Sequence, residues 1–440
     1  MPSGESARDT IAAVATPAGP GGIGIVRVSG PLVTQIAEGV LGSVPPPRSA
    51  TFKRFRDACG QTLDEGIALY FPAPHSYTGE EVLELQGHGG PVVLRMLLSA
   101  CLDAGARLAE PGEFTRRAFL EGRLDLAQAE AVADLIDAAS QEAARSAVRS
   151  LSGEFSAAID VLRGALVELR ALTEAQLDFP EEELDASHQN ATTKRLAGVR
   201  TALDDVLNRS RQGSLLRSGV HVVLAGAPNV GKSSLLNRLA GEERAIVTPI
   251  PGTTRDALRE TIQIDGVAVV LVDTAGLRHS TDELERLGMA RTHSELERAD
   301  VVLTMHDVTS VGETAPAFAT GNARIDVYNK VDLKPGFIPS PGAVAVSAKT
   351  GQGMAELRSA IVRAAGLSST GESTFLARER HLRALVGAQA HLARAVAEQE
   401  RWELFAEELR LAHDQLSSIT GAFTADDLLG EIFGRFCIGK

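Results

Sequence analysis

Residues 226–233 read Gly-Ala-Pro-Asn-Val-Gly-Lys-Ser, a spacing that lets a short loop surround a phosphate group. Gly226 and Gly231 permit the tight turn that points backbone N–H groups at phosphate. Lys232 is expected to reach the β- and γ-phosphates of a nucleotide, and the Ser233 hydroxyl to ligate Mg²⁺. The predicted contacts in this loop are Asn229, Val230, Gly231, Lys232, Ser233 and Ser234.

The flanking sequence predicts the elements that hold this loop. The apolar, β-branched run at 220–224 predicts a buried strand, and residues 233–239 carry apolar side chains at helical spacing. The motif requires strand, glycine loop and helix in this order, because the helix N-terminus places favourable dipole charge beside the phosphate.

Four further short motifs follow along the chain, at 253–256, 273–276, 329–332 and 347–349, in the order expected of one nucleotide-binding domain. Thr254 is the predicted second side-chain ligand of Mg²⁺, on a switch loop. Asp273 ends an apolar strand, where a carboxylate can hold the Mg²⁺ shell, and the Gly276 N–H can bond to the γ-phosphate. The predicted contacts here are Thr253, Thr254, Asp273, Thr274, Ala275, Gly276, Asn329, Lys330, Asp332, Ser347, Ala348 and Lys349.

Asn329 and Asp332 indicate which base is bound. A carboxylate can accept hydrogen bonds from the N1–H and 2-amino groups of guanine, whereas adenine offers neither and would leave the carboxylate unpaired. Residues 347–349 follow another apolar strand and are expected to close over the base. The nucleotide is therefore predicted to be GTP rather than ATP.

Leu277 follows the Asp-Thr-Ala-Gly motif, where Ras-like enzymes place a glutamine that orients the attacking water. A leucine cannot do this. Glu283 and Glu285 are the nearby acidic candidates, and a solvated helix face is the alternative interpretation of both.

Composition limits the class of protein. The 440 residues include 57 acidic and 44 basic side chains, a net charge of −13, which argues against a broad electrostatic grip on nucleic acid. No apolar run is long enough to span a membrane, and the N-terminus lacks the features of a signal peptide. The three cysteines are scattered, so they indicate neither a disulfide framework nor a zinc cluster. We expect a soluble, cytoplasmic protein.

Changes in composition along the chain predict the domains. Residues 1–120 alternate glycine, proline and short β-like runs, which indicates a small α/β domain. Residues 121–217 and 371–440 have helical periodicity, and 218–370 alternate strands with helices around the nucleotide motifs. The predicted fold is an N-terminal α/β domain and a discontinuous helical bundle into which a Ras-like P-loop GTPase domain is inserted.

Beyond the GTPase motifs, the chain strongly resembles the MnmE (TrmE) family of bacterial and organellar tRNA-modification GTPases over essentially its whole length. The stretches that carry the resemblance, together with the GTPase motifs, are 9–13, 21–27, 77–90, 111–120, 124–130 and the C-terminal Phe-Cys-Ile-Gly-Lys at 436–440.

The resemblance implies an N-terminal domain that dimerises and binds 5-formyl- or 5,10-methylene-tetrahydrofolate. It also implies a heterotetramer with the flavoprotein MnmG, which forms aminomethyl or carboxymethylaminomethyl groups at C5 of the wobble uridine of certain tRNAs. Arg27, Glu84, Arg123 and Lys440 match the family's folate contacts. Their types suit the ligand, since Arg and Lys fit the glutamate tail and a carboxylate fits the pterin N–H groups.

The resemblance also implies that K⁺ activates hydrolysis by supplying positive charge at the paired nucleotide sites. Asn229 matches the family's K⁺-ligating asparagine. Thr248, Ile250 and Thr253 match its K⁺-binding loop, whose Thr248, Pro249, Ile250, Pro251 and Gly252 are also predicted to border GTP. Glu285 matches the position of the family's water-orienting glutamate, so the resemblance favours this role over that of a residue on a solvated helix face.

Lys232, Glu285 and Cys437 are thus the catalytic candidates. For Cys437, participation in one-carbon chemistry and a passive place in the folate pocket stay equally open. Two other functions compete: a ribosome-assembly GTPase, which the acidic composition and the lack of a basic RNA-binding module argue against, and a folate-dependent transferase whose GTPase only regulates it.

Overall fold

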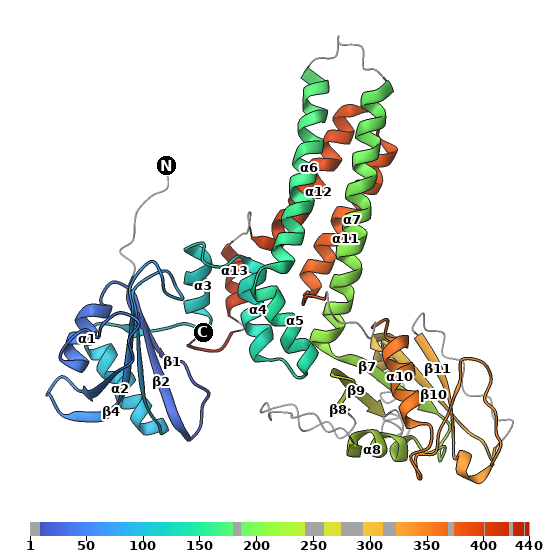
Figure 1. The fold of residues 1–440 in the computed structure, drawn as a ribbon, viewed down its shortest axis with the longest axis horizontal. Helices are drawn as coiled ribbons and strands as arrows, with labels where there is room; N and C mark the ends of the chain where they lie inside the picture. Colours follow the sequence, from blue (N-terminus) through green and yellow to red (C-terminus); the bar gives the residue numbers. More distant parts are fainter. Residues whose placement is uncertain are drawn as a thin grey trace, which may run out of the picture. The chain divides into compact units, whose positions relative to one another are not determined.

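A computed structural model describes residues 9–178, 186–242, 259–273, 294–310, 323–367, 374–399, 401–421, 426–434 and 436–439. The chain divides into two compact units, Met1–Ala133 with Ser417–Lys440, and Asp134–Leu416. Figure 1 labels the helices and strands of each.

The first unit is built on a six-stranded sheet of order β3-β4-β5-β2-β1-β6. Its strands are β1 (Ile11–Val14), β2 (Gly21–Ser29), β3 (Thr51–Arg56), β4 (Thr62–Phe71), β5 (Val82–Gly89) and β6 (Arg107–Leu108). All neighbouring strands are antiparallel except β1 and β6. Helices α1 (Val33–Leu41) and α2 (Pro91–Asp103) share a hydrophobic core with one face of this sheet.

Apolar and polar residues alternate along β5, so the face of the sheet away from α1 and α2 carries polar side chains. Leu83 and Leu85 are buried in the core beneath the helices, whereas Glu84, Gln86 and His88 alternate with them. Because successive side chains of a strand point to opposite faces, these three polar residues lie on the face away from α1 and α2.

Both ends of the sequence meet in the first unit. Helix α3 (Glu113–Leu120) contacts α13 (Asp426–Phe433), and α4 (Leu126–Ile136) shares a small aromatic core with both. The C-terminal segment then returns toward the sheet, where Ile438 forms an antiparallel bridge with Pro111. The last residues of the chain therefore lie beside elements from its first third.

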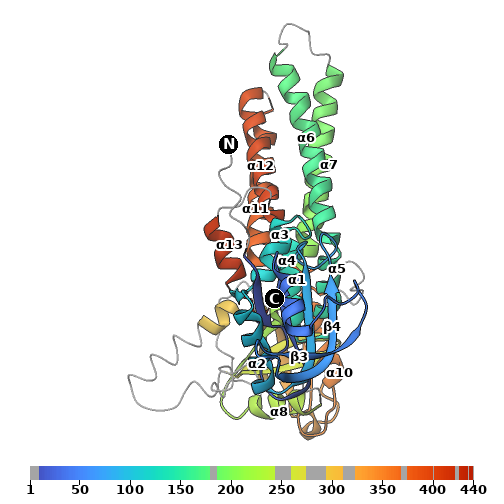
Figure 2. The same cartoon turned by 90° about the vertical axis from the view of Figure 1, so that its left-hand side faces the viewer.

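The second unit contains long helices at both ends of its sequence. They are α5 (Gln141–Leu151), α6 (Glu154–Asp178), α7 (Ala186–Ser218), α11 (Glu379–Ala397) and most of α12 (Trp402–Thr420). Helix α7 packs against α6 and α11. Figure 2 shows α6 and α7 side by side. On α11 the buried residues Leu385, Ala388, Leu392 and Ala395 recur every three or four positions, as expected of a helix with one buried face.

In the sequence, the segment between α7 and α11 forms a second six-stranded sheet, of order β12-β11-β10-β7-β9-β8. The strands are β7 (Val220–Gly226), β8 (Arg259–Ile264), β9 (Val267–Asp273), β10 (Val301–Asp307), β11 (Ala323–Asn329) and β12 (Val344–Ala345). All pair in parallel except β8 with β9. The helices α8 (Lys232–Glu242) and α10 (Met354–Ala364) share a hydrophobic core with this sheet.

The predicted fold class is confirmed. A mixed α/β unit comes first, and helices that precede and follow the second sheet in sequence enclose it as an insertion. In the part of the chain that the structure describes, no helix is both long enough and apolar enough to cross a membrane.

Candidate functional site

The phosphate loop joins β7 to α8 at the carboxyl end of the central strand. Gly226 has a φ of 155° and Gly231 a φ of 96°. A Cβ on Gly226 would come 2.7 Å from the Met305 carbonyl oxygen, and one on Gly231 would come 2.3 Å from the Asn329 side-chain amide. Only glycine fits either position, because a side chain would meet both strain and close contact.

Lys232 and Ser233 open helix α8 and point back over this loop. The ammonium of Lys232 donates to the carbonyl oxygens of Gly226, at 3.0 Å, and Ala227, at 2.8 Å. The Ser233 hydroxyl donates to a carboxylate oxygen of Asp273 at 3.0 Å. Asp273 lies at the end of β9, opposite Leu224 of β7, so the sheet itself brings the two side chains together.

The groups expected to recognise the base gather beside the loop. The Asn329 amide donates to the Val230 carbonyl at 2.9 Å and accepts from the Ala348 N–H at 3.1 Å. Asp332 accepts from the Ser347 hydroxyl at 2.6 Å. One strand end and the segment after β12 are therefore tied to the phosphate loop before any base contact is considered.

Lys330 completes this arrangement. Its ammonium donates to the Asn229 carbonyl at 2.9 Å and pairs with a carboxylate oxygen of Asp307 at 2.5 Å. Ser234 and Lys349 are exposed at the edge of the same site.

A second polar site lies on the sheet of the first unit, where Arg27 of β2 faces Glu84 of β5 as a cross-strand partner. The Arg27 guanidinium bonds to one Glu84 oxygen at 3.0 and 2.9 Å. It lies 5.5 Å from the ring centre of Tyr77 and 5.7 Å from that of Phe114, within the range of a cation–π contact. The C-terminal tail adds a carbonyl, since Arg27 donates to Gly439 at 3.5 Å.

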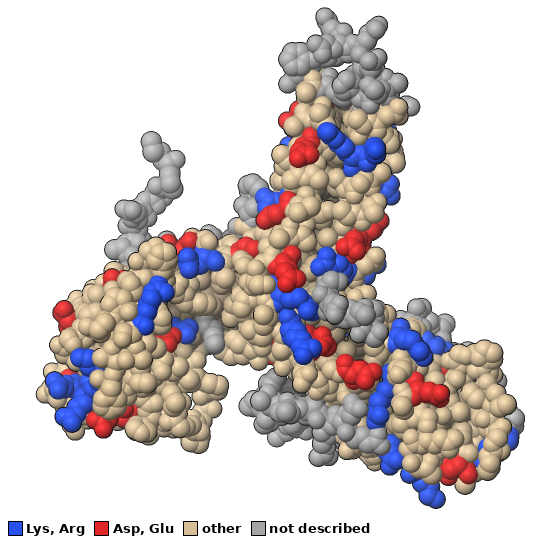
Figure 3. Space-filling model, viewed as in Figure 1, with Lys and Arg blue, Asp and Glu red and all other residues tan. Residues whose placement is uncertain are grey.

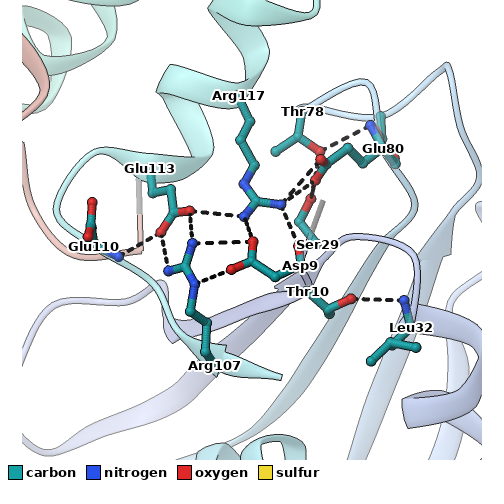
Figure 4. Close-up of polar contacts among 11 residues, drawn as sticks. Asp9, Thr10, Ser29, Leu32, Thr78, Glu80, Arg107, Glu110, Glu113 and Arg117 are labelled. Carbon is teal, nitrogen blue, oxygen red and sulfur yellow. Dashed lines mark hydrogen bonds and ion pairs between the residues drawn. The ribbon is translucent and has the colours of Figure 1, made fainter. Parts of the chain in front are cut away.

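An ion-pair network holds helix α3 against this site (Figure 4). Arg117 of α3 bonds to Asp9, Glu80 and Glu113, and Arg107 bonds to Asp9 and Glu113. The hydrogen bond from Arg107 lowers the pKa of Asp9, and the bond from Arg117 adds to it, outweighing the opposing effect of burial. The network joins the start of the sheet, the segment before β5 and α3.

Helix α3 in turn positions the aromatic walls around Arg27. Phe114 is fully buried on this helix, and the neighbouring Thr115 hydroxyl lies 2.8 Å from the Tyr77 hydroxyl. Burial raises the pKa of Tyr77, so the phenol keeps its proton at neutral pH and can serve as a donor.

Comparison with known proteins decides the family. The model of the MnmE helical domain matches residues 126–437, and that of the GTP-binding protein TrmE N-terminus matches residues 10–123. A tRNA modification GTPase MnmE of Azoarcus sp. (strain BH72) is 59% identical over 443 residues, covering 98% of each chain. The protein of that name from Thiobacillus denitrificans is 58% identical over 438 residues, again covering 98% of each. The chain belongs to the MnmE family of tRNA modification GTPases.

Family membership confirms the predicted GTP hydrolysis. The structure brings together the predicted contacts Asn229, Val230, Gly231, Lys232, Ser233, Asp273, Asn329, Lys330, Asp332, Ser347 and Ala348. Two predicted nucleotide contacts, Ser234 and Lys349, are described and exposed. The other predictions for the nucleotide and K⁺ lie outside the described residues: Thr248, Pro249, Ile250, Pro251, Gly252, Thr253, Thr254, Thr274, Ala275, Gly276 and Glu285.

The residues predicted from the MnmE resemblance to bind folate are placed in part. Arg27 and Glu84 are bonded to each other, and the stem of Arg123 borders Gly79 on an exposed stretch after α3. Lys440 lies outside the described residues. Cys437 is exposed, and its carbonyl accepts from the Gly112 N–H at 3.4 Å. The tail that carries Cys437 therefore reaches the Arg27 site through Gly439.

Sequence reasoning did not single out the contributions of Asp307, Tyr77 or the ion pairs of Arg117. For one of these the spacing is compatible with a helical ion pair, because Glu113 and Arg117 are four residues apart on α3. The other partners come from distant segments. Figure 3 shows basic and acidic side chains interspersed over the described residues of one face.

Proposed function

We propose that this chain is a K⁺-activated GTPase that acts with the flavoprotein MnmG on the wobble uridine of certain tRNAs. It forms an aminomethyl or carboxymethylaminomethyl group at C5, using a one-carbon unit carried by 5-formyl- or 5,10-methylene-tetrahydrofolate. The proposal follows from family membership and from one observation: a phosphate loop and an Arg27–Glu84 site occur in the same chain. We further propose a cytoplasmic homodimer that forms a heterotetramer with MnmG.

The domain assignment belongs to the same proposal. Residues 1–120 bind tetrahydrofolate and dimerise, and 218–370 form the GTPase domain. Residues 121–217 and 371–440 form the helical domain, which ends in the Cys-Ile-Gly-Lys tail.

The nucleotide site suits Mg²⁺ and GTP. A hydroxyl and a carboxylate oxygen 3.0 Å apart, on Ser233 and Asp273, are hard oxygen donors of the kind Mg²⁺ prefers. Thr254 is the proposed second side-chain ligand. When bound, Mg²⁺ neutralises charge that develops on the phosphates. Lys232 supplies a fixed positive charge at the phosphates, and Asp332 accepts from the guanine N–H groups.

The K⁺ site is proposed at Asn229, Thr248, Ile250 and Thr253. Amide, hydroxyl and carbonyl oxygens suit a weakly hydrated hard cation, and Asn229 is exposed at the phosphate loop. When bound, K⁺ supplies positive charge beside the phosphates. Leu277 has no group that can orient the attacking water, and we assign this role to Glu285 because it matches the family's water-orienting glutamate.

The folate site is proposed at Arg27, Glu84, Arg123 and Lys440. Glu84 can accept two N–H donors of a pterin, and the ring of Tyr77, which lies 5.5 Å from its partner Arg27, supplies flat apolar surface nearby. Cys437 is a candidate participant in one-carbon chemistry, because its exposed thiol lies on the tail that reaches Arg27.

A reconstituted reaction tests the proposal. Purified chain, MnmG with its flavin, GTP, methylene-tetrahydrofolate, undermodified tRNA and a nitrogen donor, ammonium or glycine, are combined in KCl or in NaCl at equal ionic strength. We expect modified uridine and fast GTP hydrolysis in KCl, and no modified uridine when folate is omitted. Equal hydrolysis in both salts would contradict K⁺ activation, and folate-independent modification would contradict the folate site.

Comparing Glu285→Ala with the wild type in this reaction separates two functions. The proposal predicts that modification is lost together with GTP hydrolysis. A transferase that the GTPase only regulates would keep basal transfer.

A further inference from the structure

Asp307 is the last residue of β10 and is not part of any of the GTPase sequence motifs. It is the register partner of Asn329, so the two strand ends lie side by side. Its carboxylate pairs with the Lys330 ammonium at 2.5 Å, and the same ammonium donates to the Asn229 carbonyl at 2.9 Å. A continuous chain of polar contacts therefore runs from Asp307 through Lys330 to the phosphate loop.

Asp307 is itself fixed in place. One of its carboxylate oxygens accepts from the Thr309 N–H at 2.8 Å and from the Thr309 hydroxyl at 2.7 Å, which leaves the other oxygen for Lys330. Only 10% of the side chain is exposed. Burial raises the pKa of Asp307, but the bonds from Lys330 and Thr309 outweigh it and keep the pKa below its ordinary value. The carboxylate is thus a rigid negative charge.

Asn229 needs such support, because its backbone is left-handed, with a φ of 63°. Asparagine tolerates this region better than most residues, but still at a cost. Its carbonyl is held by Lys330, and the carbonyl of the next residue, Val230, is held by the Asn329 amide. Two adjacent residues at the end of β11 therefore fix two successive peptide groups of the loop, and so the direction in which the Asn229 side chain leaves it.

We propose that Asp307 is a positioning residue for K⁺ activation: it orients Lys330, which holds the Asn229 backbone so that the Asn229 amide oxygen faces the cation. This inference rests on the K⁺ site of the proposed function. It adds a residue that contacts neither nucleotide nor cation and acts through two others.

The consequence should be larger for the cation than for the nucleotide, although Lys330 is itself a predicted nucleotide contact. Phosphate and Mg²⁺ contacts come from Lys232, Ser233 and Asp273, none of which bonds to Asp307 in the described part of the chain. Loss of the Asp307 charge should therefore weaken K⁺ binding more than it weakens binding of the nucleotide.

The test compares the full-length wild type with Asp307→Ala and Asp307→Asn. The matched control is Asp326→Asn. Asp326 is likewise a strand carboxylate with a lowered pKa, whose burial is outweighed by bonds from His306 and Arg324, neither of them in the phosphate loop. KCl is titrated against NaCl at constant ionic strength and saturating GTP, and the half-saturating K⁺ concentration for hydrolysis is measured.

Two readouts that need no turnover accompany it. One is the KCl-dependent rise in the thermal unfolding midpoint of the GDP–aluminium fluoride complex. The other is the dissociation rate of a fluorescent GDP analogue in NaCl alone.

We expect the half-saturating K⁺ concentration to rise on the order of tenfold in Asp307→Ala, since a hydrogen bond to a charged group is lost. Asp307→Asn should show a smaller rise, because its amide oxygen can still accept from Lys330 or Thr309. The KCl concentration needed to stabilise the complex should rise in parallel, whereas the rate of GDP dissociation in NaCl should change by less than about twofold. In the control Asp326→Asn, neither the stabilisation by KCl nor the rate of GDP dissociation should change.

Unchanged half-saturating K⁺ concentrations in both Asp307 variants, with a wild type that responds to KCl, would overturn this inference and leave K⁺ activation intact. An equal shift of GDP dissociation would also overturn it, by showing that the ion pair supports nucleotide binding. A wild type indifferent to KCl would refute K⁺ activation itself, and the inference with it.

Discussion

The two candidate sites of this chain are held by different kinds of contact. In the phosphate loop the side chains bond to the backbone: Lys232, Asn329 and Lys330 all donate to carbonyl groups of residues 226–230. On the sheet of the first unit, Arg27 is held chiefly by side chains, with Glu84 as its ion pair and two aromatic rings beside it. The phosphate loop is held through its backbone carbonyl groups by residues of short motifs. The geometry of the Arg27 site instead depends on side chains from several distant segments.

The largest effect predicted from this comparison is the loss of Lys232. Lys232 is buried, and its ammonium lies over the loop, where we propose that its charge meets the phosphates. Lys232→Ala should reduce kcat for GTP hydrolysis on the order of a hundredfold or more, measured by phosphate release. Lys334→Ala is the control, because Lys334 lies over the Phe337 ring of the same unit and should leave hydrolysis unchanged. Similar losses in both variants would contradict the assigned role of Lys232.

The next prediction concerns the choice of base. In Asp332→Asn the carboxylate that we propose accepts two guanine N–H groups becomes an amide that offers a donor, which suits the 2-oxo group of xanthine. The ratio of kcat/KM for GTP over xanthosine triphosphate should fall on the order of a hundredfold. Ser347 still finds an oxygen at position 332, so folding should be retained. An unchanged ratio would show that the base is read elsewhere.

The sheet site should respond to a much smaller chemical change. Glu84→Gln keeps the size of the side chain but removes the charge that pairs with Arg27 and that we propose accepts pterin N–H groups. We expect the Kd for 5-formyl-tetrahydrofolate, measured by calorimetry, to rise on the order of tenfold, with GTP hydrolysis unchanged.

Glu65→Gln is its control, since Glu65 forms an exposed pair with Arg54 on the neighbouring strands. If Glu65→Gln weakened folate as much as Glu84→Gln, the ligand would not be bound at Arg27 and Glu84.

These predictions also mark how far the sequence alone can lead. The loop residues and Asp273, Asn329 and Asp332 are found in short contiguous motifs, and the structure brings them together because parallel strands end at one edge of the sheet. The strand expected at 220–224 is β7, and the helix expected at 233–239 is α8.

The sheet site could be found only by resemblance. Arg27 and Glu84 are 57 residues apart, and Arg117 bonds to Asp9 from 108 residues away. Such pairs depend on strand register and on the path of the tail, which local periodicity does not encode. The same holds for Asp307, which meets Lys330 only because β10 and β11 are paired in parallel.

The smallest predicted effect is on stability in acid. Burial raises the pKa of Glu113, but bonds from Arg107 and Arg117 outweigh it and bring the pKa below the ordinary 4.5. The pKa of Asp9 is lowered as well. Groups with a lowered pKa in the folded chain stabilise it above the unfolded pKa, and this stabilisation is lost as pH falls through the folded value. The thermal midpoint of the wild type should therefore fall steeply below about pH 4.5.

Glu113→Gln should start from a lower midpoint at pH 7 and fall less steeply, since one of the titrating groups is gone. Glu65→Gln should follow the wild type. Parallel curves for Glu113→Gln and the wild type would mean that this ion pair contributes no stability that depends on pH.

The central claim is that one chain joins a GTPase to a folate site for modification of the wobble uridine. Nucleoside mass spectrometry of tRNA tests it most directly, in a strain that lacks the gene and carries back the wild type, Lys232→Ala or Glu84→Gln. We predict that aminomethyl-type uridines disappear without the gene, return with the wild type, and stay absent with Lys232→Ala and reduced with Glu84→Gln. Intact uridine modification in the strain without the gene, together with accumulated ribosomal precursors, would contradict the claim and favour a ribosome-assembly GTPase.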